Sequence, residues 1–235
     1  MTQSSIRYAR IFSTIIAVGM TAATTACGDD KSSNTAPLVA TTVTINTGSD
    51  GQTGTVGQAL AQPISVHVVD QNGAAFAGAT VTWTVMSGGG AVSGPTSTTN
   101  ATGDATTTWT LGNTAGADSL KADLGNGASV IVAATATAGP FASLALMSGD
   151  AQSLTAGSTT QPLIVKAVDA LGNVVANATV TWTVTGGGTL SASSTTTDAT
   201  GLAQITLATD ATPETYTVIA TSGAAAPVTF TITGM

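Results

Sequence analysis

One seven-residue string, ATVTWTV, occurs twice in this chain, at residues 79–85 and again at residues 178–184. The flanking sequence repeats with it: PISVHVVDQNG at 63–73 matches PLIVKAVDALG at 162–172, and TTNATGDA at 98–105 matches TTDATGLA at 196–203. The second copy is one residue shorter, in a glycine-rich turn that tolerates a deletion. The duplication predicts two copies of one domain, which we place at residues 38–138 and 139–235.

The repeated string alternates apolar and hydroxyl side chains, as a strand that is buried on one face requires. Val81 and Val85 lie on the same predicted face as the tryptophan between them, and threonines occupy the other face. Similar segments are separated by Gly, Asn or Pro throughout both copies, which is typical of an all-β sandwich. The tryptophans that we expect in the cores are Trp83, its equivalent Trp182, and Trp109, whose counterpart is Leu207.

The composition excludes several classes of protein. Only 7% of the residues are charged, whereas 43% are hydrophobic, which is the reverse of what disordered chains show. The formal net charge of −7 disfavours nucleic acid, because phosphate backbones select for clustered Lys and Arg. We therefore expect a folded chain with no nucleic-acid partner.

The N-terminus has the features of an export signal. Arg7 and Arg10 precede an apolar segment that ends in small residues before Cys27, the single cysteine of the chain. This segment resembles that of bacterial lipoproteins, in which the cysteine becomes the acylated N-terminus. The resemblance implies a lipoprotein signal peptide at residues 1–26, a lipid on Cys27 that contacts the membrane, and a flexible tether at residues 27–37. Cleavage near the same point without lipidation is the alternative, and one cysteine allows no disulfide within the chain.

Short motifs inside the repeat resemble the bacterial Ig-like domains of group 1, which are the modules repeated in invasin and intimin adhesins. The motifs are Val-x-Asp-x-x-Gly at 68–73, with Ala first at 167–172, then Ala-x-Val-x-Trp, a glycine-rich turn and a Thr-Gly hairpin. The resemblance covers nearly all of residues 38–235. It implies that the two predicted sandwiches are tandem Ig-like domains.

Polar residues that recur in both copies are predicted to shape turns. An Asp at the first turn position can accept a hydrogen bond from the backbone two residues on, and glycine supplies the left-handed conformation. The predicted turn residues are Asp70, Gly73, Asp169, Gly172, Gly103 and Gly201.

Two further interpretations concern acidic residues. We align Asp118, Ser119 and Leu120 of the first copy with Glu214, Thr215 and Tyr216 of the second, which matches one acidic residue with another. We expect no metal site. The alternative is a calcium site in the first copy, and its candidate ligands are the carboxylates of Asp70, Asp118 and Asp123.

The sequence predicts no enzyme, no cofactor and no metal. It contains no nucleophile elbow, no dinucleotide-binding glycine motif and no zinc-protease motif. His67, the only histidine, aligns with Lys166 on an outward face, and its neighbours Ser65 and Val69 supply no carboxylate to orient it. We therefore interpret His67 as a solvated surface residue.

These observations favour a non-enzymatic lipoprotein of the bacterial cell envelope, in the outer membrane or at the cell surface. It would act in adhesion, as an interaction module or as a stalk, with a protein or polysaccharide partner. The alternative is a carbohydrate- or polymer-binding accessory protein with an exposed row of aromatic residues, drawn from Phe76, Phe141 and Tyr216. The short junction TATAGPFASL at 135–144 further predicts a semi-rigid rod.

Overall fold

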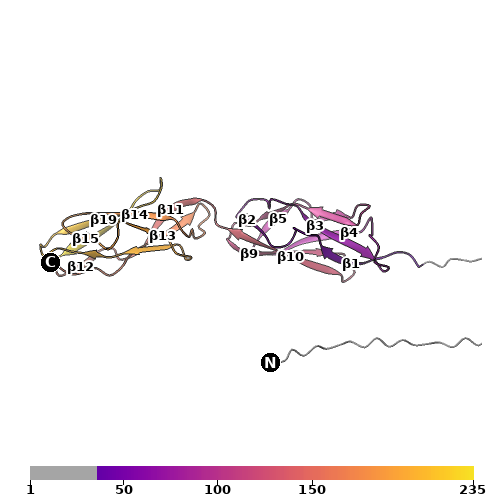
Figure 1. Cartoon of the computed structure of the whole chain (residues 1–235), viewed down its shortest axis with the longest axis horizontal. Helices are drawn as coiled ribbons and strands as arrows, with labels where there is room; N and C mark the ends of the chain where they lie inside the picture. Colours follow the sequence, from indigo (N-terminus) through magenta and orange to yellow (C-terminus); the bar gives the residue numbers. More distant parts are fainter. Residues whose placement is uncertain (1–35) are drawn as a thin grey trace, which may run out of the picture. The chain divides into compact units, whose positions relative to one another are not determined.

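The computed structural model describes residues 36–235, and all of their regular structure is β-strand (Figure 1). Leu38–Met235 forms one compact unit. Within the described residues, no helix is long and apolar enough to cross a membrane. The predicted signal peptide, Cys27 and nearly all of the predicted tether at 27–37 lie outside the described residues.

The strands fall into two sets, β1 to β10 and β11 to β20, and no sheet combines strands from both sets. In the first set, which we call the first sandwich, the strands are β1 (Ala40–Ile45), β2 (Gln52–Thr55), β3 (Ile64–Asp70), β4 (Thr80–Ser87), β5 (Gly90–Val92), β6 (Thr96–Thr98), β7 (Asp104–Thr107), β8 (Trp109–Leu111), β9 (Gly116–Asp123) and β10 (Ser129–Thr137). A three-stranded sheet has the order β1-β3-β7, a five-stranded sheet has the order β2-β10-β9-β4-β6, and β5 pairs with β8.

The second set, called the second sandwich, repeats this topology. Its strands are β11 (Phe141–Ser148), β12 (Gln152–Leu154), β13 (Leu163–Asp169), β14 (Thr179–Thr185), β15 (Thr189–Leu190), β16 (Ser194–Thr196), β17 (Leu202–Ile205), β18 (Leu207–Ala208), β19 (Thr215–Thr221) and β20 (Val228–Gly234). The sheets have the orders β11-β13-β17 and β12-β20-β19-β14-β16, and β15 pairs with β18. In both sets the first strand, β1 or β11, joins the three-stranded sheet. The second strand joins the five-stranded sheet, where β2 runs parallel to β10 and β12 runs parallel to β20.

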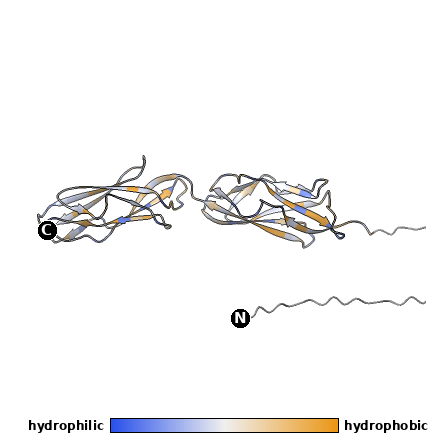
Figure 2. Cartoon of the chain, in the orientation of Figure 1, coloured by the Kyte–Doolittle hydropathy of each residue, from blue (hydrophilic) through white to orange (hydrophobic). Residues whose placement is uncertain are grey.

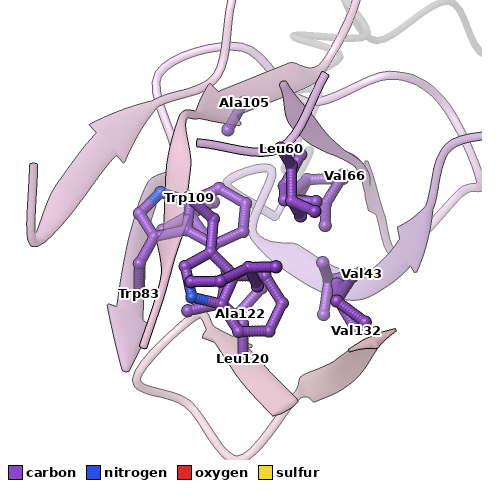
Figure 3. Packing of buried hydrophobic residues seen from close by; sticks show 14 of the residues in the cluster. Val43, Leu60, Val66, Trp83, Ala105, Trp109, Leu120, Ala122 and Val132 are labelled. Carbon is purple, nitrogen blue, oxygen red and sulfur yellow. The ribbon is translucent and has the colours of Figure 1, made fainter. Parts of the chain in front are cut away.

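Alternating burial along the strands builds the two cores. The central strands β3 and β13 bury every second residue completely or nearly so, and their other residues are half-buried. Trp83 is 3% exposed and Trp182 is 2% exposed, and Trp109 is fully buried. Figure 3 shows both tryptophans of the first sandwich in one cluster with Leu120 and Ala122. Hydrophobic residues are concentrated in the strands (Figure 2). The prediction of an all-β fold is confirmed.

The strand register defines which residues of the two copies are equivalent. Trp83 of β4 lies opposite Ala122 of β9, and the matching tryptophan of β14 lies opposite Ala220 of β19. On both strands the residue four positions earlier faces the same core. These residues are Asp118 in the first sandwich and Tyr216 in the second.

The alignment of Asp118 with Glu214, and of Leu120 with Tyr216, is therefore wrong by two positions. It matched one acidic residue with another, whereas the strand register matches a buried carboxylate with a buried phenol. The aromatic ring that fills this end of the first core comes instead from Trp109 on β8, where the second sandwich has Leu207. Leu207 and Tyr216 of the second sandwich thus correspond to Trp109 and Asp118 of the first, with one aromatic side chain in each pair.

Candidate functional sites in the turns and on the sheet faces

The two Asp turns have the same geometry in both sandwiches. Asp70 is 4% exposed, and its Oδ1 accepts hydrogen bonds from the backbone N–H groups of Asn72 (2.8 Å) and Ala74 (3.0 Å). Gly73 completes this turn with a φ of 78°. These carboxylates hold the loop that follows the central strand, so the structure uses them for the fold.

Asp169 caps the equivalent turn, in which Gly172 has a φ of 87°. Its Oδ1 accepts from the N–H groups of Leu171 and Asn173, both at 2.8 Å, and its Oδ2 accepts from the N–H of Gly139 at 2.8 Å. Burial acts to raise the pKa of Asp169, but a hydrogen bond from the Asn173 side chain to Oδ2 (3.0 Å), together with these backbone hydrogen bonds, outweighs it and lowers the pKa. A single carboxylate thus fixes both a turn and the segment that enters β11.

Gly103 and Gly201 close the second recurrent turn, where a side chain would not fit. Their φ angles are 78° and 76°. A β-carbon on Gly103 would lie 2.7 Å from the carbonyl oxygen of Val68, and one on Gly201 would lie 2.9 Å from that of Ala167. Both glycines therefore permit a close backbone approach to the central strand.

His67 has an acidic partner that the sequence did not indicate. Its Nδ1 lies 3.0 Å from Oδ1 of Asp104 on the neighbouring strand β7. Asn46 Nδ2 donates to the same carboxylate at 2.9 Å, and the Thr102 hydroxyl donates to its Oδ2 at 2.7 Å. Hydrogen bonds from Asn46, Thr102 and His67 lower the pKa of Asp104 to about 2.

The interpretation that no carboxylate orients His67 is therefore wrong. The sequence neighbours of His67 offer no carboxylate, whereas Asp104 reaches the histidine from the adjacent strand β7. The side chain of His67 is 34% exposed, as expected for an outward-facing residue. The cluster joins β1, β3 and β7 on the outer face of the three-stranded sheet, and the second sandwich has Lys166 and Leu202 at the positions of His67 and Asp104.

The three carboxylates considered for calcium do not form a cluster. Asp70 is held in its turn, and Asp123 pairs with Lys121, which lowers the pKa of Asp123. Asp118 is 2% exposed, on the core face of β9. Within residues 36–235, no group of three or more His, Cys, Asp and Glu side chains is placed to hold a metal ion.

The aromatic residues considered for an exposed row are buried or half-buried. Tyr216 is fully buried, so its interpretation as a surface aromatic is wrong. Its hydroxyl donates to Oδ1 of Asp210 at 2.8 Å, and burial followed by the Asp210 contact raises the pKa of Tyr216 to about 12. Phe76 and Phe141 are half-buried, and Phe76 packs against the first core. The described residues therefore offer no fully exposed aromatic ring for sugar stacking.

One asparagine links the two sandwiches. Asn173, in the turn between β13 and β14, donates from Nδ2 to the carbonyl oxygen of Asn113 at 2.9 Å. Its Oδ1 accepts from the N–H of Ala115 at 2.8 Å. The amide side chain thus pairs with a backbone donor and a backbone acceptor, much as another strand would.

Comparison with known proteins supports the fold. Residues 143–233 match the model of the bacterial Ig-like domain (group 1). The second sandwich is therefore a bacterial Ig-like domain of group 1, as the sequence motifs implied. No curated protein matches the chain.

FdeC and InvD are two of the solved structures that share this fold. FdeC, an Escherichia coli adhesin, is 23% identical with a TM-score of 0.59, and the match covers 84% of this chain and 64% of that chain. InvD of Yersinia pseudotuberculosis is 18% identical with a TM-score of 0.51, covering 82% of this chain and 57% of that chain. This chain thus spans less than two thirds of the length of either structure. At these identities the likeness shows the fold, which confirms the prediction of Ig-like sandwiches.

Proposed function

We propose that this chain is a non-enzymatic lipoprotein of the bacterial cell envelope that exposes its Ig-like sandwiches for adhesion or as a stalk. The observation that carries the proposal is that the residues recurring in both copies shape turns. Asp70 and Asp169 cap equivalent turns, and Gly103 and Gly201 allow equivalent close approaches. Because these residues serve the fold in both copies, their recurrence does not indicate a reaction site.

The His67 cluster also fits a structural role. A catalytic histidine needs its second ring nitrogen to face a substrate site, and His67 lies on the outer face of a sheet. Asp104 accepts from side chains of three separate segments, so its carboxylate ties β1 and β3 to the turn before β7. The cluster therefore has a structural use, which is to link these segments on the outer face of the three-stranded sheet.

Two further observations support a place in the envelope. The N-terminal segment carries the export and lipidation pattern that ends at Cys27. FdeC, which is more similar in fold to this chain than InvD is, is called an adhesin.

The adhesive role is tested by comparing three strains: wild type, a strain that lacks the gene, and one that carries Cys27→Ser. We expect both altered strains to attach less to a polymer-coated or cell-coated surface than the wild type does. Radiolabelled fatty acid should label the wild-type protein alone. Equal attachment by all three strains would refute adhesion, and attachment that free polysaccharide abolishes would favour a carbohydrate-binding accessory protein.

A further inference from the structure

The loop between β9 and β10 carries an asparagine that connects it to the first strand. Asn126 is exposed, and its Nδ2 donates to the carbonyl oxygen of Ala40 at 2.7 Å, where β1 begins. Its Oδ1 accepts from the N–H of Ala128 at 3.0 Å. β1 belongs to the three-stranded sheet, whereas β9 and β10 belong to the five-stranded sheet. This side chain therefore links the hairpin of one sheet to the entry of the other.

The next residue is a glycine whose backbone nitrogen has no acceptor. Gly127 is exposed and has a φ of 95°, a conformation that favours glycine over other residues. Within residues 36–235 its N–H makes no hydrogen bond. Glycine has no β-carbon that would shield this nitrogen from the preceding side chain. The nitrogen and the Asn126 amide are thus held next to each other, which favours a ring-closing reaction between them.

A backbone donor contacts the oxygen on which charge develops in that reaction. Attack of the Gly127 nitrogen on Cγ of Asn126 converts Oδ1 into an oxyanion. The N–H of Ala128 already donates to this oxygen. A hydrogen bond that strengthens as negative charge forms lowers the barrier of such a step. Three consecutive residues thus supply the electrophile, the nucleophile and the donor.

The other Asn-Gly pair of the chain lacks this arrangement. Asn-Gly occurs at 72–73 and at 126–127. The N–H of Gly73 donates to the carbonyl oxygen of Asp70 at 3.1 Å, which closes the Asp turn. In the second sandwich, the loop between β19 and β20, at 222–227, contains no asparagine. Of the two Asn-Gly pairs, only the one at Asn126 has a nitrogen free to react.

We propose that Asn126 is a site of spontaneous deamidation, and that the reaction releases the entry of β1. The Gly127 nitrogen forms a bond to Cγ of Asn126 and loses its proton. The bond from Cγ to Nδ2 breaks, and the amide group takes up a proton and leaves as ammonia. Water then opens the succinimide ring at one of its two carbonyl groups, which leaves aspartate or isoaspartate at position 126.

The product cannot make the original link. A carboxylate has no hydrogen to donate, so it meets the carbonyl oxygen of Ala40 as one acceptor beside another. Isoaspartate also lengthens the main chain of the loop by one carbon. The entry of β1 loses its contact with the hairpin, and the first sandwich becomes less stable as the protein ages.

Peptide mapping by mass spectrometry of the purified full chain tests the reaction. During incubation at mildly alkaline pH, Asn126 should gain the mass that corresponds to replacement of NH2 by OH, while Asn72 stays intact as the internal control. In denaturant, the two pairs should convert at equal rates. Conversion of Asn126 that is no faster than that of Asn72 in the folded chain would overturn the proposal. Slower conversion of Asn126 in the folded chain than in denaturant would also overturn it, because the fold would then protect the site.

Asn126→Asp supplies one product directly and tests the release of β1. Loss of the hydrogen bond to Ala40 should lower the Tm of the first sandwich by about 3 °C or more and leave that of the second unchanged. The decrease should persist at high salt, which screens the added charge but does not restore the donor. An unchanged Tm, or a decrease that salt abolishes, would contradict the release of β1.

Discussion

Replacing Trp182 with alanine should unfold the second sandwich and leave the first one folded. Trp182 is 2% exposed, and its ring lies 6.1 Å from that of Phe230, centroid to centroid. Its Nε1 donates to the hydroxyl of Thr195 at 2.8 Å. The substitution removes the largest side chain of a core whose other members come from both sheets.

The expected cost follows from this environment. Deleting a buried Trp side chain costs about 3 to 5 kcal/mol, because the lost transfer free energy adds to that of the cavity. The aromatic contact with Phe230 contributes about 0.5 to 1.5 kcal/mol within that range. For a domain of this size, each kcal/mol shifts Tm by about 4 to 8 °C, so the second sandwich should melt at least about 12 °C lower.

Differential scanning calorimetry of residues 36–235 measures the effect. We expect one transition to move down while the other keeps its temperature, and Trp83→Ala should move the opposite one. Trp182→Phe is the control, because it retains an aromatic ring beside Phe230 and loses only the Thr195 hydrogen bond and some volume. It should cost about 1 to 2 kcal/mol.

Two results would refute this reasoning. An unchanged thermogram for Trp182→Ala would mean that the indole is exposed in solution and free to stack on sugars. A single transition that moves as a whole would mean that the sandwiches unfold together, so that their cores are not independent.

Three further predictions follow from the polar contacts. Hydrogen bonds lower the pKa of Asp104 to about 2, so the ionised carboxylate contributes fully to stability above about pH 4 and loses this contribution as the pH falls toward 2. Asp104→Asn should therefore flatten the decline in Tm between about pH 4 and about pH 2. The pKa of Tyr216 near 12 predicts that its absorbance at high pH changes only as the second sandwich unfolds, and a change near the ordinary value of 10 would contradict its burial. Asn173→Ala removes the hydrogen bonds to Asn113 and Ala115, so ¹⁵N relaxation should show the two sandwiches tumbling more independently; unchanged relaxation would show that the junction at 135–144 alone restrains them.

The sequence predicted the features that depend on local periodicity. Alternation along ATVTWTV identified the strand that carries Trp83, and the repeat identified Trp182 as its equivalent. The Asp turns were predictable for the same reason, because Asp70 bonds a backbone group only two residues away.

Contacts between strands could not be read in this way. Asp104 reaches His67 from the adjacent strand, and no sequence neighbour of the histidine indicates it. The alignment of Asp118 failed because acid was matched with acid, although the pattern of buried positions on β9 and β19 would have matched it with Tyr216. Chemical likeness is a weaker guide to equivalence than strand register, since a two-residue slip keeps every side chain on its own face and so leaves the alternating pattern intact.

Labelling of intact cells tests the proposed role most directly. An antibody against residues 36–235 should bind unpermeabilised wild-type cells, and Cys27→Ser should move that signal from the cells to the medium or the periplasm. Labelling that appears only after the outer membrane is opened, with no change in Cys27→Ser, would contradict a lipid-anchored module that acts at the cell surface.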